Sequence, residues 1–330
     1  YIGMAYSYGD QYIPLDSLEG GILVTEKSIG DELGVQTGDK ILAVDGDKVD
    51  NFGALFLEIV NGNTITIERD GRVFDQAIPV DFIATLIEDE DKARFISFRL
   101  PFIIKEVSKD SPNKGVDLKE GDEIVAIGSD KVAYFDQAVP LLEKYAGQNI
   151  PLKVKRRDGT FKTVNVKVSD DAKLGVAVGA LTMKDYADMG VFRINTQKYT
   201  FLEAIPAGID RGVTTLTGYV KQLKKIFNPE TGAYKGVGGF AAIGSMFPDT
   251  WNWEIFWGTT ALISIILAFM NILPIPALDG GHVMFLLYEM ISGRKPSDKF
   301  LEYAQMVGFF LLIALLLFAN GNDVYKWLFK

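Results

Sequence analysis

A long apolar run that two prolines interrupt constrains this chain more than any other feature. Residues 255–291 form a predominantly apolar stretch of 37 residues, whereas about 20 residues suffice for a helix to cross a bilayer. Pro274 and Pro276 lie inside the run, five and three residues before Asp279. Because proline removes a backbone donor and collides with the preceding turn, we predict a broken transmembrane helix whose interruption presents Asp279.

Asp279 is the carboxylate that this interruption exposes. A charged group at membrane depth is costly and marks a functional site by default, and freed backbone is tolerated there only where protein or a water-filled cavity covers it. An Asp followed by Gly-Gly and an apolar run is also a common helix start. The alternative is therefore that Asp279 caps a second helix at the membrane surface.

The residues around Asp279 resemble the second metal-binding motif of the site-2 protease family of intramembrane zinc metalloproteases, most closely its bacterial RseP-type branch. The resemblance implies Zn²⁺ as cofactor, Asp279 as its third protein ligand and Asn271 as a substrate-positioning residue. It also implies that Pro274 and Pro276 shape an unwound segment that pairs with the substrate. His282, one helical turn past Asp279, could bind a metal, but the family motif commonly carries it as a supporting or packing residue. The motif reads Asn271-Ile272-Leu273-Pro274-Ile275-Pro276-Ala277-Leu278-Asp279-Gly280-Gly281-His282, in which Gly280 is also a supporting residue.

The first half of the chain contains an internal repeat. The pair Gly38-Asp39 recurs as Gly121-Asp122 after 83 residues, and each copy continues with a short apolar strand, a turn and a segment of helical spacing. A repeat of this length indicates two copies of one domain. The pattern Gly-Val-x-x-Gly-Asp-x-Ile resembles the PDZ domain in its permuted bacterial form.

PDZ domains bind an extended peptide as an added strand beside a helix. The resemblance places one groove between residues 21–24 and the expected helix at residues 52–60. It places the other between residues 100–104 and the expected helix at residues 135–145. The alternative is that both modules are spacers that obstruct access to the site and bind no peptide.

The predicted fold class is a multidomain protein with two α+β PDZ-like domains followed by an all-α membrane region. The 27 residues from 201 to 227 are amphipathic, so they could lie along a membrane surface or pack on the second module. The predicted divisions are an N-terminal linker at 1–19, the first PDZ-like domain at 20–82, a charged connector at 83–98, the second PDZ-like domain at 99–180, a linker with the amphipathic helix at 181–250 and a membrane domain with two transmembrane segments at 251–330.

The loop at residues 292–299 sets the expected orientation. It is short and carries Arg294, Lys295 and Lys299 against Asp298 alone, and short basic loops stay in the cytoplasm. A second span centred on residues 306–319 returns the C-terminus to the outer side. We therefore expect a multi-pass protein of the bacterial inner membrane, in contact with membrane lipid, with periplasmic modules.

Composition excludes several classes of function. Residues 1–199 hold 33 acidic against 24 basic residues, and the remainder holds 10 of each, so nucleic-acid binding, which needs basic patches, is not expected. The chain has no cysteine, which removes disulfides and a cysteine nucleophile. Its one histidine, His282, lies in a membrane segment, which argues against a Ser/His/Asp protease.

The resemblance implies a zinc metalloendopeptidase that cleaves the transmembrane segment of a membrane protein already trimmed outside, such as an anti-sigma factor or a remnant signal peptide. The family takes two histidines and a base glutamate from a His-Glu-x-x-His helix. These 330 residues contain no such motif, so we expect no catalytic base in this chain and expect the chain to begin after that helix. The main alternative is a membrane-anchored, non-catalytic adaptor whose tandem PDZ modules bind peptides. A transporter is disfavoured, because the helix break has no partner in a second repeat.

Overall fold

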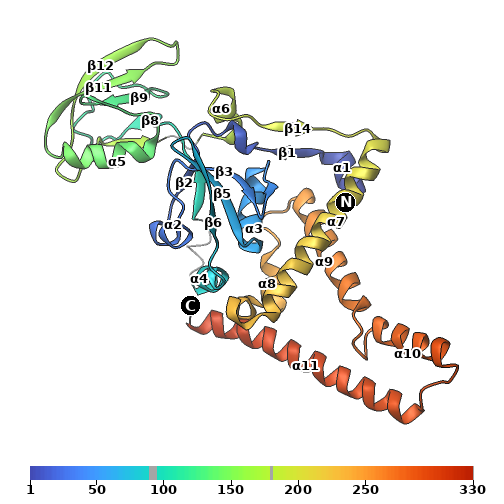
Figure 1. The fold of residues 1–330 in the computed structure, drawn as a ribbon. Helices are drawn as coiled ribbons and strands as arrows, with labels where there is room; N and C mark the ends of the chain where they lie inside the picture. Colours follow the sequence, from blue (N-terminus) through green and yellow to red (C-terminus); the bar gives the residue numbers. More distant parts are fainter. Residues whose placement is uncertain (89–94, 179–180, 330) are drawn as a thin grey trace. The chain divides into compact units, whose positions relative to one another are not determined.

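The computed structural model describes residues 1–88, 95–178 and 181–329 (Figure 1). It divides the chain into two compact units. One unit, here called the helical unit, comprises residues 1–11, 80–93 and 196–330. The other, here called the module unit, comprises residues 12–79 and 94–195.

The first repeat of the module unit forms around a four-stranded antiparallel sheet in the order β4-β3-β5-β6. Every second side chain of β5 faces inward, since Ile65 and Ile67 are fully buried, which is the period-two pattern of a half-buried strand. Helix α3 covers them with Leu55 and Ile59, one turn apart. The elements are η1 (Leu15–Ser17), β2 (Ile22–Val24), α2 (Lys27–Leu33), β3 (Lys40–Val44), β4 (Asp47–Lys48), α3 (Phe52–Asn61), β5 (Thr64–Arg69), β6 (Arg72–Ala77) and β7 (Ile96–Phe98).

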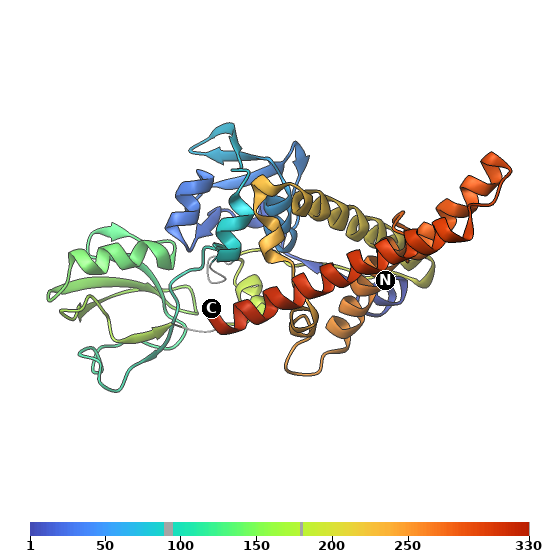
Figure 2. The same cartoon turned by 90° about the horizontal axis from the view of Figure 1, so that it is seen from below.

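The second repeat has the same strand order, β10-β9-β11-β12, and α5 lies against its sheet in both views (Figures 1 and 2). Its core is apolar and buries Ile127, Leu152 and Val154 completely. Residues 108–118, which correspond to the region of α2, form turns here. The elements are β8 (Ile104–Val107), β9 (Glu123–Ile127), β10 (Asp130–Lys131), α5 (Phe135–Lys144), β11 (Asn149–Lys155), β12 (Phe161–Lys167) and β13 (Val176–Val178).

The repeated Gly-Asp pair has one structural role in both copies. Asp39 is buried and accepts hydrogen bonds from the Gln36 amide at 2.7 Å and from Arg69 Nε and Nη2 at 2.7 Å each. Asp122 is buried in the same way, and it accepts from the Lys119 amide at 2.8 Å and from Arg156 Nη1 at 3.0 Å. A buried carboxylate needs such partners, so the repeat conserves an internal ion pair.

The strands beside the predicted grooves have backbone partners at particular residues. Strand β2 pairs with β7 on one side, and on the other its Ile22 exchanges backbone hydrogen bonds with Gly38 and Asp39. Strand β8 pairs with β13, and its Ile104 exchanges backbone hydrogen bonds with Gly121 and Asp122. Among the described residues, β7 and β13 each have one strand partner, as do the outer strands β6 and β12 of the two four-stranded sheets. Ile22 and Ile104 therefore have backbone partners on both sides, and the placement of peptide grooves at residues 21–24 and 100–104 stays a prediction.

The two repeats share a small apolar cluster. Phe98 at the end of β7 contacts Phe52 of α3, with ring centroids 4.7 Å apart, and Phe192, at 5.4 Å. Phe192 and Tyr186 are buried and lie in the segment that was predicted to be a linker after the second domain. This segment contains α6 (Met183–Asp188) and β14 (Asn195–Gln197), which pairs with β1 (Asp10–Tyr12).

The helical unit includes two segments that were predicted to be linkers. The N-terminal linker contributes α1 (Ile2–Tyr8), and the charged connector contributes most of α4 (Phe82–Glu88), whereas its β7 belongs to the module unit; the acidic residues 89–91 lie outside the described residues. Helix α4 contacts η3 (Pro229–Thr231) and η4 (Ala233–Gly236). The amphipathic helix α7 (Phe201–Phe227) packs along α1 and α9, and a side chain at Gly208 would collide with the backbone of Ile2.

The last helix, α11 (Asp298–Phe329), holds a glycine-rich loop with three polar side chains. Asn322 donates from its amide to the carbonyls of Lys235 and Val237, at 2.7 Å each. Asn320 and Asp323 accept from backbone amides at the start of α8 (Phe240–Ser245), at 3.2 and 3.0 Å. The loop therefore has its backbone groups satisfied by α11.

Two described helices are long and apolar enough to cross a membrane. They are α9 (Trp253–Ile272), with a mean hydropathy of 1.9, and α11, with 2.0; the predicted span at residues 306–319 lies inside α11. Between them lies α10 (Asp279–Ser292). Trp251, Trp253 and Trp257 form one aromatic cluster at the start of α9, and tryptophan is enriched at membrane interfaces.

Candidate metal centre

The predicted interruption of the apolar run is present between α9 and α10. Helix α9 ends at Ile272, and Leu273, which precedes Pro274, has extended backbone angles, as proline imposes on the residue before it. The Ile275 amide donates to the Leu273 carbonyl at 2.7 Å, which closes a three-residue turn around Pro274. The proline pair therefore ends one helix and reverses the chain before the next begins.

A second turn follows directly. The Leu278 amide donates to the Ile275 carbonyl at 3.0 Å, with Pro276 and Ala277 at the two central positions. Ala277 has a φ of 92°, which is the positive angle that a type II turn requires at its third residue. Glycine usually occupies that place, so Ala277 holds a strained conformation at the site.

Asp279 is the first residue of α10, and its side chain is exposed. Its carboxylate makes no side-chain hydrogen bond or ion pair to another described residue. A negative charge in the first turn is favoured by the helix dipole, which agrees with the helix-start alternative as well as with a ligand. The structure thus places Asp279 directly after the break, with its oxygens available.

His282 lies one turn further along α10 and is also exposed. Its ring meets the ring of Phe285 edge to face, with centroids 6.4 Å apart. Asn271 lies in the last turn of α9 with an exposed side chain. Asn271 at the end of α9 and His282 in the first turn of α10 therefore lie on the two sides of the break.

The break is held in place by close backbone packing. Gly280 is buried, and a Cβ there would lie 2.3 Å from the carbonyl oxygens of Ile272 and Leu273. Gly308 of α11 is buried against the same segment, where a Cβ would overlap the Pro276 carbonyl oxygen. Gly280 belongs to the motif, whereas Gly308 was missed, because a lone glycine in an apolar helix gives no sequence signal of what it contacts.

The described residues do not complete a zinc site. A catalytic zinc has three protein ligands and a water, and no group of three His, Cys, Asp or Glu side chains that could hold a metal occurs in the described part of the chain. Asp279 fits the donor chemistry of one such ligand, and His282 is the one nearby imidazole. Asp279 and His282 alone therefore supply at most two ligands to a metal.

Comparison with known proteins defines the class. The model of peptidase family M50 matches residues 18–315, so the chain belongs to peptidase family M50.

Individual relatives agree with this family. The chain is 27% identical over 321 residues to a protein of Pasteurella multocida, covering 92% of this chain and 70% of that one. It is 24% identical over 325 residues to the regulator of sigma E protease of Haemophilus influenzae, with the same coverage. It is 26% identical over 230 residues to the zinc metalloprotease RasP of Geobacillus kaustophilus, covering 68% of this chain and 51% of that protein. The chain thus corresponds to part of the length of each relative.

Proposed function

We propose that this chain is the substrate-binding and ligand-donating part of an intramembrane zinc metalloprotease. The observation that carries the proposal is the exposed, unpaired carboxylate of Asp279 directly after a proline-made helix break. Membership in peptidase family M50 and the names of the relatives support zinc as the metal. When bound, zinc would supply Lewis-acid chemistry.

The residues of this chain then have separate roles. Asp279 holds the metal through its carboxylate, and Asn271 orients the substrate from the end of α9. The segment from Leu273 to Leu278 has no helical hydrogen-bond ladder, so its backbone groups can pair with an extended substrate chain. The remaining metal ligands and the catalytic base come from residues other than these 330, because His282 is their sole histidine.

The substrate we propose is a transmembrane segment of a membrane protein already trimmed outside, such as an anti-sigma factor or a remnant signal peptide. The two modules share one strand order, which supports the assignment of both as PDZ-like domains that recognise or gate this substrate. Strands β7 and β13 are the edges that suit an added peptide strand. The protein would span the bacterial inner membrane with its modules in the periplasm.

Replacement of Asp279 by Asn in the complete enzyme tests the proposal. We expect the loss of zinc and a fall of at least 100-fold in cleavage of a model transmembrane substrate, since loss of a metal-site interaction typically costs on the order of 10–100-fold even outside the ligand shell. Asp298→Asn, at the equivalent first turn of α11, is the matched control and should leave both unchanged. Full zinc content in the Asp279→Asn enzyme would remove the ligand role.

The same pair of variants separates the enzyme from the alternative of a non-catalytic adaptor. An adaptor that binds peptides through β7 and β13 would keep its partners in both variants and would show no cleavage in the unaltered protein.

A further inference from the structure

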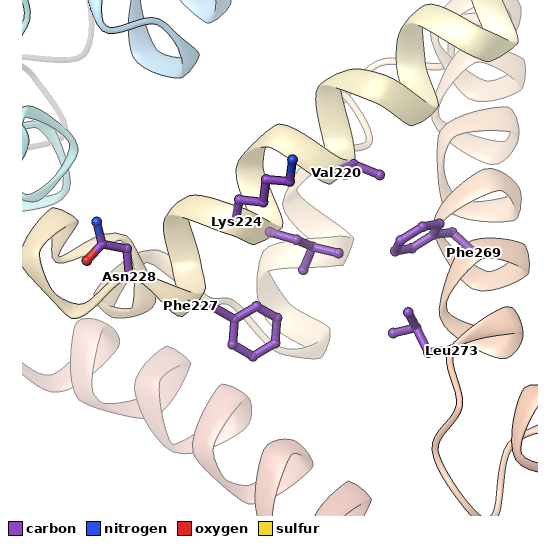
Figure 3. Close-up of a pocket in the computed structure, with 7 residues that line it drawn as sticks. Val220, Lys224, Phe227, Asn228, Phe269 and Leu273 are labelled. Atoms are coloured by element: carbon purple, nitrogen blue, oxygen red, sulfur yellow. The ribbon is translucent and has the colours of Figure 1, made fainter.

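A pocket of about 380 Å³ lies between the C-terminal halves of α7 and α9 (Figure 3). Its volume falls within the range of sites for small apolar ligands. In Figure 3 the rings of Phe227 and Phe269 and the side chain of Leu273 extend into the space between the two helices. Leu273 is also the first residue of the helix break. The lining residues are Val220, Leu223, Lys224, Phe227, Asn228, Phe269 and Leu273.

The wall of the pocket is almost entirely apolar, with one cation on it. The pocket lies at the C-terminal ends of α7 and α9, and apolar side chains of their last turns form most of its surface. Phe227 remains largely exposed at the pocket, with 80% of its surface accessible. A hydrocarbon chain matches an apolar surface of this kind, because it needs no hydrogen-bond partner.

The cation at the pocket belongs to a basic cluster. Lys221 and Lys224 lie one turn apart on α7 and are both exposed. Within the part of the chain that the structure describes, neither ammonium group has a carboxylate within ion-pair distance. Two uncompensated cations beside an apolar pocket complement a ligand with a hydrocarbon body and a negative head.

We propose that this pocket binds one acyl chain of an anionic phospholipid, with Lys224 and Lys221 at the phosphate. The proposal rests on the proposed function in one respect, namely that α9 lies in a membrane. Lysines near a membrane surface attract anionic lipids, and long basic side chains reach the headgroup while their stems follow apolar surface. The bound chain would contact Leu273 and so reach the start of the helix break.

Native mass spectrometry of the full chain tests the assignment. The chain is incubated in detergent with equal amounts of phosphatidylglycerol and phosphatidylcholine, and the lipids that stay bound after release from the detergent are identified. We expect the unaltered chain to retain phosphatidylglycerol preferentially. Lys224→Glu should lower that preference at least fivefold, because one lysine near the lipid phosphate is worth about 1 kcal/mol. Lys198→Glu makes the same charge change at an exposed position away from the pocket and should leave the preference unaltered.

A second variant tests the cavity itself. Val220→Trp fills the space from α7, so it should reduce the retention of both lipids while α7 stays helical. Equal loss of preference in Lys224→Glu and Lys198→Glu, or unchanged retention in Val220→Trp, would overturn the lipid site. Photocrosslinking from position 220 to a substrate segment, in place of lipid, would overturn it as well.

Flotation with liposomes keeps this proposal separate from the proposed function. If the chain floats with liposomes but shows no lipid preference, the pocket assignment alone fails. If the chain does not associate with liposomes, its placement in a membrane fails first, and the lipid site fails with it.

Discussion

At the scale of single residues, the two modules depend on one repeated arrangement. Asp39 and Asp122 each bind a backbone amide three residues earlier and an arginine, which is Arg69 at the end of β5 or Arg156 directly after β11. The sequence pattern pointed to the Gly-Asp pairs as a repeat. It did not point to Arg69 and Arg156, because these residues are spaced 87 apart and the aspartates 83.

Removal of either buried carboxylate should destabilise its own module. We expect Asp39→Ala to lower the local free energy of opening of β3 and β5 by about 3 kcal/mol, because a broken buried pair leaves its partner uncompensated. Amide hydrogen exchange of the full chain measures this strand by strand. Asp110→Ala changes an exposed residue and should alter the free energy of opening by less than about 0.5 kcal/mol. An equal effect of the two variants would contradict the role of the buried ion pair.

Gly308 is the residue whose change should damage the candidate metal centre from a distance. A Cβ at this position meets the Pro276 carbonyl, so Gly308→Ala should displace the break and lower both zinc content and cleavage in the complete enzyme. Gly321 lies in the same helix with no other atom within 4 Å of the corresponding Cβ. Gly321→Ala should therefore leave activity intact and stabilise the helix by about 1 kcal/mol.

At the scale of elements, the interruption between α9 and α10 follows from local sequence. Pro274 and Pro276 act locally, through φ and a missing donor, so their effect can be read from sequence. The positive φ of Ala277 could not be read, because alanine carries no preference for it. The boundaries of the connectors were also missed: α4 is a seven-residue helix and β7 a three-residue strand, and segments this short are stabilised by tertiary contacts more than by their own propensity.

The turn at Ala277 gives a test of its own. Ala277→Gly should preserve zinc content and cleavage, because glycine reaches positive φ without steric cost. Ala277→Val should reduce both, since a β-branched residue is a true outlier there. Measurement of the two variants in the complete enzyme separates strain at the turn from loss of a side-chain contact; equal activity in both would show that the turn does not position the site.

At the scale of the whole molecule, the number of available ligands limits what these 330 residues can do alone. With Asp279 and His282 as the nearby donors, residues 1–330 by themselves should bind clearly less than one equivalent of zinc and should cleave no substrate. Zinc analysis after dialysis, with and without co-expression of a segment that carries His-Glu-x-x-His, is the measurement. Stoichiometric zinc and full turnover from residues 1–330 alone would mean that the metal site lies elsewhere.

The division into units has a consequence for how the modules are built into the protein. The chain passes between the two units after residues 11, 79, 93 and 195, so the module unit is a double insertion and cannot be exchanged as a simple cassette. Excision of residues 12–195 would also remove α4, against which Gly232 and Gly236 of the helical unit pack. A graft of modules from a relative must therefore retain α4. To remove the modules alone, a deletion must leave α4 in place.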